Sequence, residues 1–164
     1  MRLRVVAVGR LKSGPERDLV DRYAARTAAL ARGLGFSGPD LVELAEGRGR
    51  RPEERRSDEA GRLRPKMSGS TVVLLDEGGP SLTSDAFAAR LAGWRDGGRP
   101  TLSFVVGGPD GLAPDLAGEA DAVLAFGRMT LPHQIVRVLV LEQLYRALTI
   151  LSGHPYHRGA GEDG

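Results

Sequence analysis

The chain of 164 residues contains no cysteine. It can therefore form neither a disulfide framework nor a thiolate zinc site, and such a composition is typical of a cytoplasmic protein. No apolar run approaches the length of a membrane span, and the first residues, MRLRVVAVGR, show no signal-peptide cleavage pattern. These absences predict a cytoplasmic protein without a membrane anchor or a bound metal.

The familiar phosphate-binding motifs are also missing. Neither G-x-G-x-x-G nor G-x-x-x-x-G-K-[ST] occurs, so the sequence offers no usual dinucleotide or nucleotide cradle. The net charge is only +2, but arginines cluster in GRGRRPEERR at residues 47–56. This run, with Arg48, Arg50 and Arg51, is a candidate contact for a polyanion; a solvated surface segment would explain it equally well.

Apolar runs rich in β-branched residues alternate with helical patterns along the chain. The runs predict strands at 3–9, 40–45, 70–76, 101–108 and 122–126. Between and after them we expect helices that open at Pro15, at Pro52 (ending at Pro65) and at Thr83 or Ser84, a helical turn over 114–119, and a helix over 133–151. This alternation predicts a single α/β domain over residues 1–158 with a parallel sheet, followed by a disordered tail at 159–164.

The last helix is unusual because it is apolar on every side. TLPHQIVRVLVLEQLYRA, residues 130–147, predicts a helix that is buried all round. Its charged residues then need partners, and the spacing of Glu142 and Arg146 allows an ion pair within the helix. His133, at the helix start, is interpreted as a capping or packing residue.

Three of the predicted strands end in loops of distinctive composition: LLDEGGPS, VVGGPDGL and FGRMTLPH. Ligands of open α/β sheets bind outside the carboxyl ends of the strands, and glycine lets the backbone approach them closely. Each loop alone is explained as a tight turn, and we interpret Asp76 in this way. Together they predict a site for an adenosine-like ligand without phosphates, bounded by backbone groups and apolar side chains from Leu75, Phe126, Met129 and Leu131.

The same residues carry a resemblance to a known family. MRLRVVAVGRLK, LLDEGG, VVGGPDGL and the continuous block FGRMTLPHQIVRVLVLEQLYRALTILSGHPYHR are similar to the SPOUT-class methyltransferases that modify N3 of a pseudouridine in 23S rRNA. The resemblance spans nearly the whole chain. It implies a parallel-sheet SPOUT fold whose C-terminal part threads a deep trefoil knot, an exception to the rule that chains do not knot. It also implies S-adenosylmethionine (AdoMet) as cofactor, the 23S rRNA of the ribosome as substrate, and a homodimer.

The resemblance assigns roles to individual residues. It places AdoMet against Leu75, Gly107, Phe126, Gly127, Arg128, Met129, Thr130 and Leu131. A second copy of the chain would then cover the outer face of the helix over 133–151.

Methylation of N3 requires removal of its proton, which a nearby base or a stabilising cation would assist; His157 in the tail HPYHR and Arg137 are our candidates. Arg137 could instead form an ion pair at the dimer interface. Arg158 joins the basic run as a candidate RNA contact. The alternatives are a methyltransferase of another RNA site or of a small substrate, and a non-catalytic ribosome-binding module; the presence of both loop motifs and of the YHR tail favours the enzyme.

Overall fold

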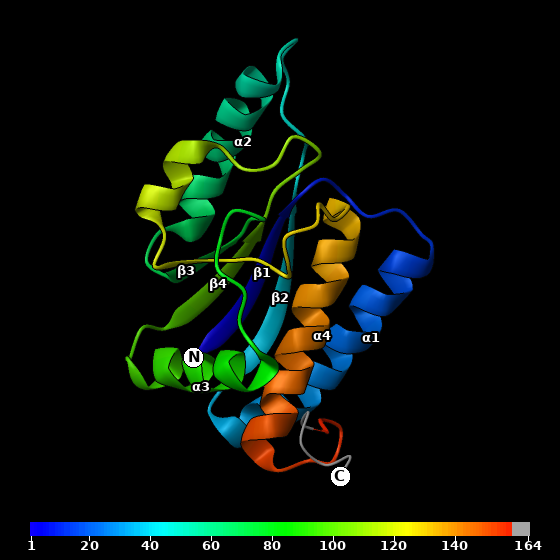
Figure 1. The fold of residues 1–164 in the computed structure, drawn as a ribbon, viewed down its shortest axis with the longest axis vertical. Coiled ribbons are helices and arrows are strands. Elements are labelled where there is room, and N and C mark those ends of the chain that lie inside the picture. Colours follow the sequence, from blue (N-terminus) through cyan, green and yellow to red (C-terminus); the bar gives the residue numbers. More distant parts are fainter. Residues whose placement is uncertain (159–164) are drawn as a thin grey trace.

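The computed structural model describes residues 1–158, which form one parallel sheet with helices on both faces (Figure 1). The tail expected at 159–164 lies outside the described residues. The strand order is β2-β1-β4-β3-β5, and every neighbouring pair is parallel. The strands are β1 (Arg2–Val8), β2 (Ser37–Leu44), β3 (Thr71–Leu75), β4 (Thr101–Val106) and β5 (Ala122–Leu124). The parallel α/β fold predicted from the sequence is therefore confirmed.

The helices divide between the two faces of the sheet. They are α1 (Pro15–Ala31), η1 (Arg32–Leu34), α2 (Pro52–Met67), α3 (Ser84–Asp96), η2 (Pro114–Glu119) and α4 (His133–Ser152). One apolar core joins α1, α3 and α4 to the sheet, and a second core joins α2 and η2 to its other face (Figure 1). All five strands point their carboxyl ends toward the same edge, where the loops selected from the sequence meet.

The local signals in the sequence place most helix starts correctly. Pro15 and Pro52 occupy the first turn of α1 and α2, where the missing N–H costs nothing. Thr83 is the N-cap of α3, and its hydroxyl accepts a hydrogen bond from the amide of Ala86 at 3.2 Å. The expected alternative, Ser84, is the first residue of the helix.

Pro65 does not end α2, and this prediction was wrong. The helix continues to Met67. Pro65 has no N–H to donate to the carbonyl of Gly61, so the helix continues past it with that one hydrogen bond missing. The side chain of Met67 is buried in the core of this face, so apolar burial favours the last turn.

The chain itself covers part of the α4 surface that we expected a second copy to cover, and the dimer stays a prediction. We expected a second copy to cover the outer face, but α1 and α3 flank α4 on the sheet (Figure 1). Val140 and Leu144 are consequently buried within one chain. The stripe that remains partly open begins at Ile135, which is 36% exposed, and continues through Leu139.

Candidate active site

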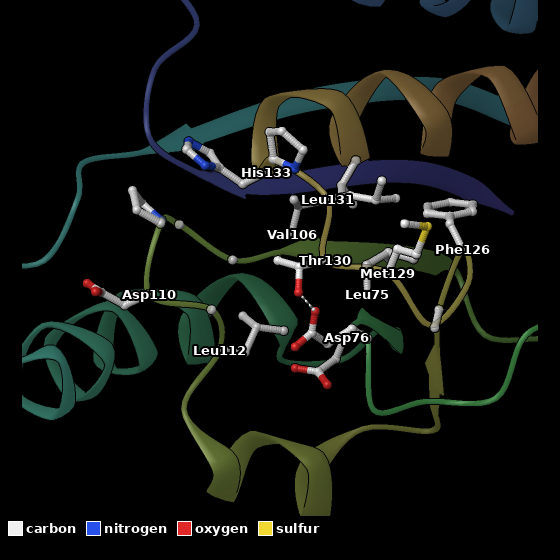
Figure 2. Close-up of a pocket in the computed structure, with 18 of the residues that line it drawn as sticks. Leu75, Asp76, Val106, Asp110, Leu112, Phe126, Met129, Thr130, Leu131 and His133 are labelled. Atoms are coloured by element: carbon white, nitrogen blue, oxygen red, sulfur yellow. Dashed lines mark hydrogen bonds between the residues drawn. The ribbon is translucent and has the colours of Figure 1, made fainter.

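A cavity of about 700 Å³ lies at the carboxyl edge of the sheet (Figure 2). The ends of β3, β4 and β5 form its floor, and the segments that follow these strands form its walls. The predicted cofactor residues Leu75, Gly107, Phe126, Gly127, Met129, Thr130 and Leu131 all line it. Arg128 does not: its side chain is exposed, and the structure brings the other seven together without it.

The loop after β4 (residues 107–112) forms a closely packed wall. A Cβ at Gly107 would lie 2.9 Å from the carbonyl carbon of Gly111, so the fold of the loop itself excludes a side chain there. The amide of Gly111 donates to the carbonyl of Gly108 at 3.0 Å. The glycine at 107 thus serves the loop's own turn, and its expected role in the close approach of a ligand stays a prediction.

An ion pair fixes this loop to α2. Arg55 donates from Nε and Nη2 to the two carboxylate oxygens of Asp110, at 2.7 and 3.1 Å. This bidentate arrangement is the strongest geometry for an arginine and a carboxylate. The neighbouring guanidinium holds the pKa of Asp110 below its usual value.

The opposite wall (residues 125–132) is joined to the segment after β3. The hydroxyl of Thr130 donates to Glu77 at 2.8 Å, as the dashed line in Figure 2 shows. Asp76 accepts a hydrogen bond from the amide of Gly78 at 2.8 Å, which confirms its interpretation as a turn residue. Phe126 and Met129 are 38% and 82% exposed, so this wall presents apolar surface to solvent.

His133 lines the cavity from the first turn of α4 (Figure 2). Burial lowers the pKa of this imidazole, and the positive charge of Arg137 lowers it further. It makes no side-chain capping bond, since Pro132 is the N-cap residue. We interpreted His133 as a capping or packing residue; the capping role was wrong, and the side chain is partly buried beside the cavity. Its position directly after the loop FGRMTLP was the signal for a residue of the site.

Arg137 is buried and lies outside the cavity lining. It donates to Glu43 at 2.7 Å and to the carbonyl oxygens of Val8 and Gly9 at 3.2 and 3.1 Å. Burial lowers the pKa of Arg137, and the Glu43 carboxylate opposes that shift. The ion pair is formed within one chain, and in this arrangement the guanidinium cannot contact a substrate.

His157 lies at the other end of the molecule from its own chain's cavity. Its ring contacts Arg146 at 3.4 Å and is 3.5 Å from Asp85. Arg146 also donates to Glu142 at 3.0 Å, which confirms the predicted pair within α4. At about 1.5 Å per residue, Arg146 is roughly 20 Å along the helix from His133. Within one chain, His157 therefore does not reach the cavity.

The candidate RNA contacts lie at two opposite ends of the molecule. Arg48, Arg50 and Arg51 are exposed just before α2, and the exposed Arg158 follows α4. The start of α2 and the end of α4 lie at opposite ends of the molecule (Figure 1). Arg51 is partly neutralised, since it pairs with Glu54 at 3.0 Å. The basic residues do not form one continuous surface on a single chain.

The described part of the chain shows neither a metal-ligand cluster nor a membrane-spanning helix. Over residues 1–158, no cluster of three or more His, Asp or Glu side chains has an arrangement that could hold a metal ion. No helix of that described part is long and apolar enough to span a membrane.

The fold and the cavity together define a class of protein, an α/β protein with a cavity at the carboxyl edge of a parallel sheet. The family model of predicted SPOUT methyltransferases matches residues 1–157. The chain therefore belongs to the SPOUT methyltransferase family, which confirms the resemblance and the fold class. The trefoil knot stays a prediction.

Relatives of known name cover almost the whole chain. A protein of Methylobacterium sp. (strain 4-46) named Ribosomal RNA large subunit methyltransferase H is 58% identical over 161 residues, 98% of this chain and 99% of its own. A protein of Hyphomonas neptunium with the same name is 52% identical over 159 residues, 96% of this chain and 99% of its own.

Solved structures show the same fold at low identity. A probable methylase family protein from Haemophilus influenzae Rd KW20 has a TM-score of 0.53 at 12% identity, over 96% of this chain and 70% of that one. A probable methyltransferase from Bordetella pertussis Tohama I has a TM-score of 0.50 at 17% identity, over 89% and 93% of the two chains.

Proposed function

We propose that this protein is an AdoMet-dependent methyltransferase of 23S rRNA that methylates N3 of a pseudouridine in the assembled ribosome. The observation that carries the proposal is the cavity at the carboxyl edge of the sheet, which gathers all three loops selected from the sequence. The name shared by relatives at 52–58% identity points to the RNA of the large ribosomal subunit. The resemblance in the sequence adds the pseudouridine.

The cavity fits AdoMet in size and chemistry. Leu75, Val106, Leu124 and Leu131 supply apolar surface for a nucleoside, and the backbone of the loops supplies donors and acceptors. Asp76 and Glu77 add negative charge that favours a cationic ligand. AdoMet, when bound, supplies a methyl group already activated by its sulfonium, so the protein's part is to orient the base and accept its proton.

Two histidines are chemically suited to accept the N3 proton. Burial lowers the pKa of His133 and so favours the neutral imidazole, which can accept a proton. His157 could act only in the cavity of a second copy. In an isologous dimer that packs two α4 helices antiparallel, the tail of one chain lies beside the α4 start of the other.

An apolar patch on one chain supports this dimer. The large hydrophobic side chains that remain exposed over residues 1–158 are Leu82, Phe126, Met129 and Ile135. Phe126 and Met129 lie on the cavity wall after β5, Leu82 lines a smaller neighbouring pocket with Phe126, and Ile135 lies in the first turn of α4. Exposed apolar side chains of this kind mark an interaction surface. Light scattering at micromolar concentration is expected to report twice the mass of the chain; a monomer would contradict the dimer.

The function itself is tested on RNA. Mass spectrometry of 23S rRNA from a strain that lacks the protein should show one pseudouridine without its methyl group, and the restored gene should return it. If the methyl group is missing from another nucleotide, the protein is a methyltransferase of a different RNA site. If no nucleotide changes, the proposal is wrong.

A further inference from the structure

Two adjacent arginines of α2 have very different surroundings. Arg55 is fully engaged, because it holds both carboxylate oxygens of Asp110 and also donates to the carbonyls of Gly49 and Arg50 at 3.2 Å. Arg56 lines the cavity beside the loop after β4. The first arginine is therefore a structural residue of the wall, and the second faces the space that the wall encloses.

Arg56 has no ion pair of its own among residues 1–158, although its charge helps to lower the pKa of the nearby Asp110 carboxyl. Its one hydrogen bond is a long one, from Nη1 to the backbone carbonyl of Asp110 at 3.5 Å. Its Nε is buried without a hydrogen-bond partner. No carboxylate of residues 1–158 lies within ion-pair distance of it, and the nearby carboxylate of Asp110 is already taken by Arg55. A half-buried guanidinium without a counter-charge is costly, and an anion in the cavity would remove that cost.

The charged residues that line the cavity are unevenly distributed between its two sides. Asp76 and Glu77 lie at the β3 side of the cavity, whereas Arg56 comes from α2. Among the described lining residues, Arg56 is the only lysine or arginine. Asp110 also lines the cavity on the side of Arg56, but its bidentate pair with Arg55 offsets its charge. An anionic group is therefore repelled from the β3 side and attracted to Arg56.

AdoMet carries such an anionic group, since its methionine part ends in a carboxylate and an ammonium group. We propose that Arg56 binds the carboxylate of the methionine part of AdoMet. This inference rests on the proposed function, because it assumes AdoMet as the ligand. An RNA phosphate offers the same anionic chemistry, but Arg56 lines the cavity that would hold the cofactor, so the cofactor's own carboxylate is favoured.

Titration calorimetry with two matched ligands tests the proposal. S-adenosylhomocysteine and 5′-methylthioadenosine share the nucleoside and an uncharged sulfur, but only the first has the amino-acid carboxylate. Arg56→Ala should weaken the binding of S-adenosylhomocysteine about 10- to 100-fold, the range expected for a lost charge-assisted hydrogen bond. Binding of 5′-methylthioadenosine should not change, and Arg56→Lys should recover part of the loss. Lys66→Ala, which removes an exposed charge from the same helix, is the matched control and should leave both affinities unchanged.

The outcomes that overturn the inference are distinct. An equal loss for both ligands would show that Arg56 only shapes the cavity. Unchanged affinities with weaker, more salt-sensitive binding to ribosomes would assign Arg56 to an RNA phosphate. A wild-type protein that binds neither ligand would refute the proposed function itself, and a wild-type protein that binds both leaves only the role of Arg56 to be decided.

Discussion

The two walls of the cavity differ in how the chain holds them. The loop after β4 is packed against the rest of the protein: a Cβ at Gly108 would lie 3.0 Å from Val8 Cγ1, and Asp110 is clamped by Arg55. The wall after β5 has few such restraints. The amide of Ala125 donates to Pro80 at 3.0 Å and Thr130 donates to Glu77, but Met129 is 82% exposed.

This difference shows which part of the site one chain can complete by itself. The wall after β4 is preorganised, so its geometry is set before any ligand binds. The wall after β5 leaves apolar side chains in solvent, at a cost of about 25 cal/mol for each Å² of apolar surface that could be buried. A second copy of the chain or the bound ligand is expected to cover it.

The largest effect is expected from removal of the C-terminal tail, residues 154–164. This deletion tests whether the tail of a second copy completes the cavity at the wall after β5. Deletion of residues 154–164 should leave AdoMet binding intact, because Leu75, Gly107 and residues 126–131 remain. Methyl transfer to ribosomes should fall by about 10²–10⁴-fold, the range for a lost general base. Activity would be measured with radiolabelled AdoMet and ribosomes from a strain that lacks the protein.

Single substitutions of the two histidines in the tail show which of them the deletion acts through. His157→Ala should lower turnover more than His154→Ala, since His154 precedes Pro155 and shapes the turn. Full activity of the truncated protein would exclude the tail from the site. His133, on the cavity of the same chain, would then be the remaining candidate for the proton acceptor.

The next largest effect concerns Arg137, which anchors the first turns of α4 just beyond the open wall. Arg137→Met should lower the free energy of unfolding by about 3 kcal/mol, the low end for a broken buried pair, because Glu43 keeps Arg17 as a partner at 2.7 Å. Urea unfolding measures this loss. A stable variant that has lost methyl transfer would restore the catalytic interpretation of Arg137.

The sequence predicted the fold well where the physical signal is local. β-branched runs located the five strands, and a parallel sheet necessarily brings the three loops to one edge. The partner of Arg137 could not be predicted in this way, because Glu43 is 94 residues distant in the chain. The apolar residues of α4 likewise predicted that this helix is buried. They could not predict that α1 and α3 bury it, because the neighbours of a helix depend on the strand order.

The part of the site that is encoded locally in the loops could also be predicted from the sequence. Seven of the eight expected cofactor residues line the cavity, because loop composition carried that information. Arg56 was missed because it stood in a run of arginines that all looked alike. Only the structure separates it from Arg55, which has a carboxylate partner.

A smaller effect is expected from glycine substitutions that sharpen the contrast between the walls. Gly107→Val forces a Cβ against the carbonyl of Gly111, and overpacking of this kind costs about 1–3 kcal/mol. If the loop shifts to relieve the overpacking, the cavity wall loses its geometry, and calorimetry should show AdoMet binding weakened about 10- to 100-fold. Gly127→Ala meets open space but a φ of +135°, so only backbone strain opposes it, and its effect on affinity should be smaller. Equal effects of the two variants would contradict the difference between the walls.

The smallest effect concerns Glu59, which lies beneath the preorganised wall. Its carboxyl is 3% exposed and accepts a hydrogen bond from the amide of Gly47 at 2.8 Å. Burial raises its pKa above the ordinary value, and the negative charges of Asp110 and Glu46 act in the same direction. The folded state therefore holds this proton more tightly than the unfolded state, and ionisation costs stability as the pH rises through the interval between the two pKa values.

Glu59→Gln removes that cost, because glutamine cannot ionise and its carbonyl can still accept the hydrogen bond from Gly47. The variant should melt with the wild type at a pH below both pKa values and about 2–4 °C above it at pH 8, as for a gain of ~1 kcal/mol in a chain of this size. Thermal unfolding across this pH range measures the difference. A difference that stays constant with pH would mean that Glu59 carries the same charge in both states, and the wall would then rest on an ionised carboxylate.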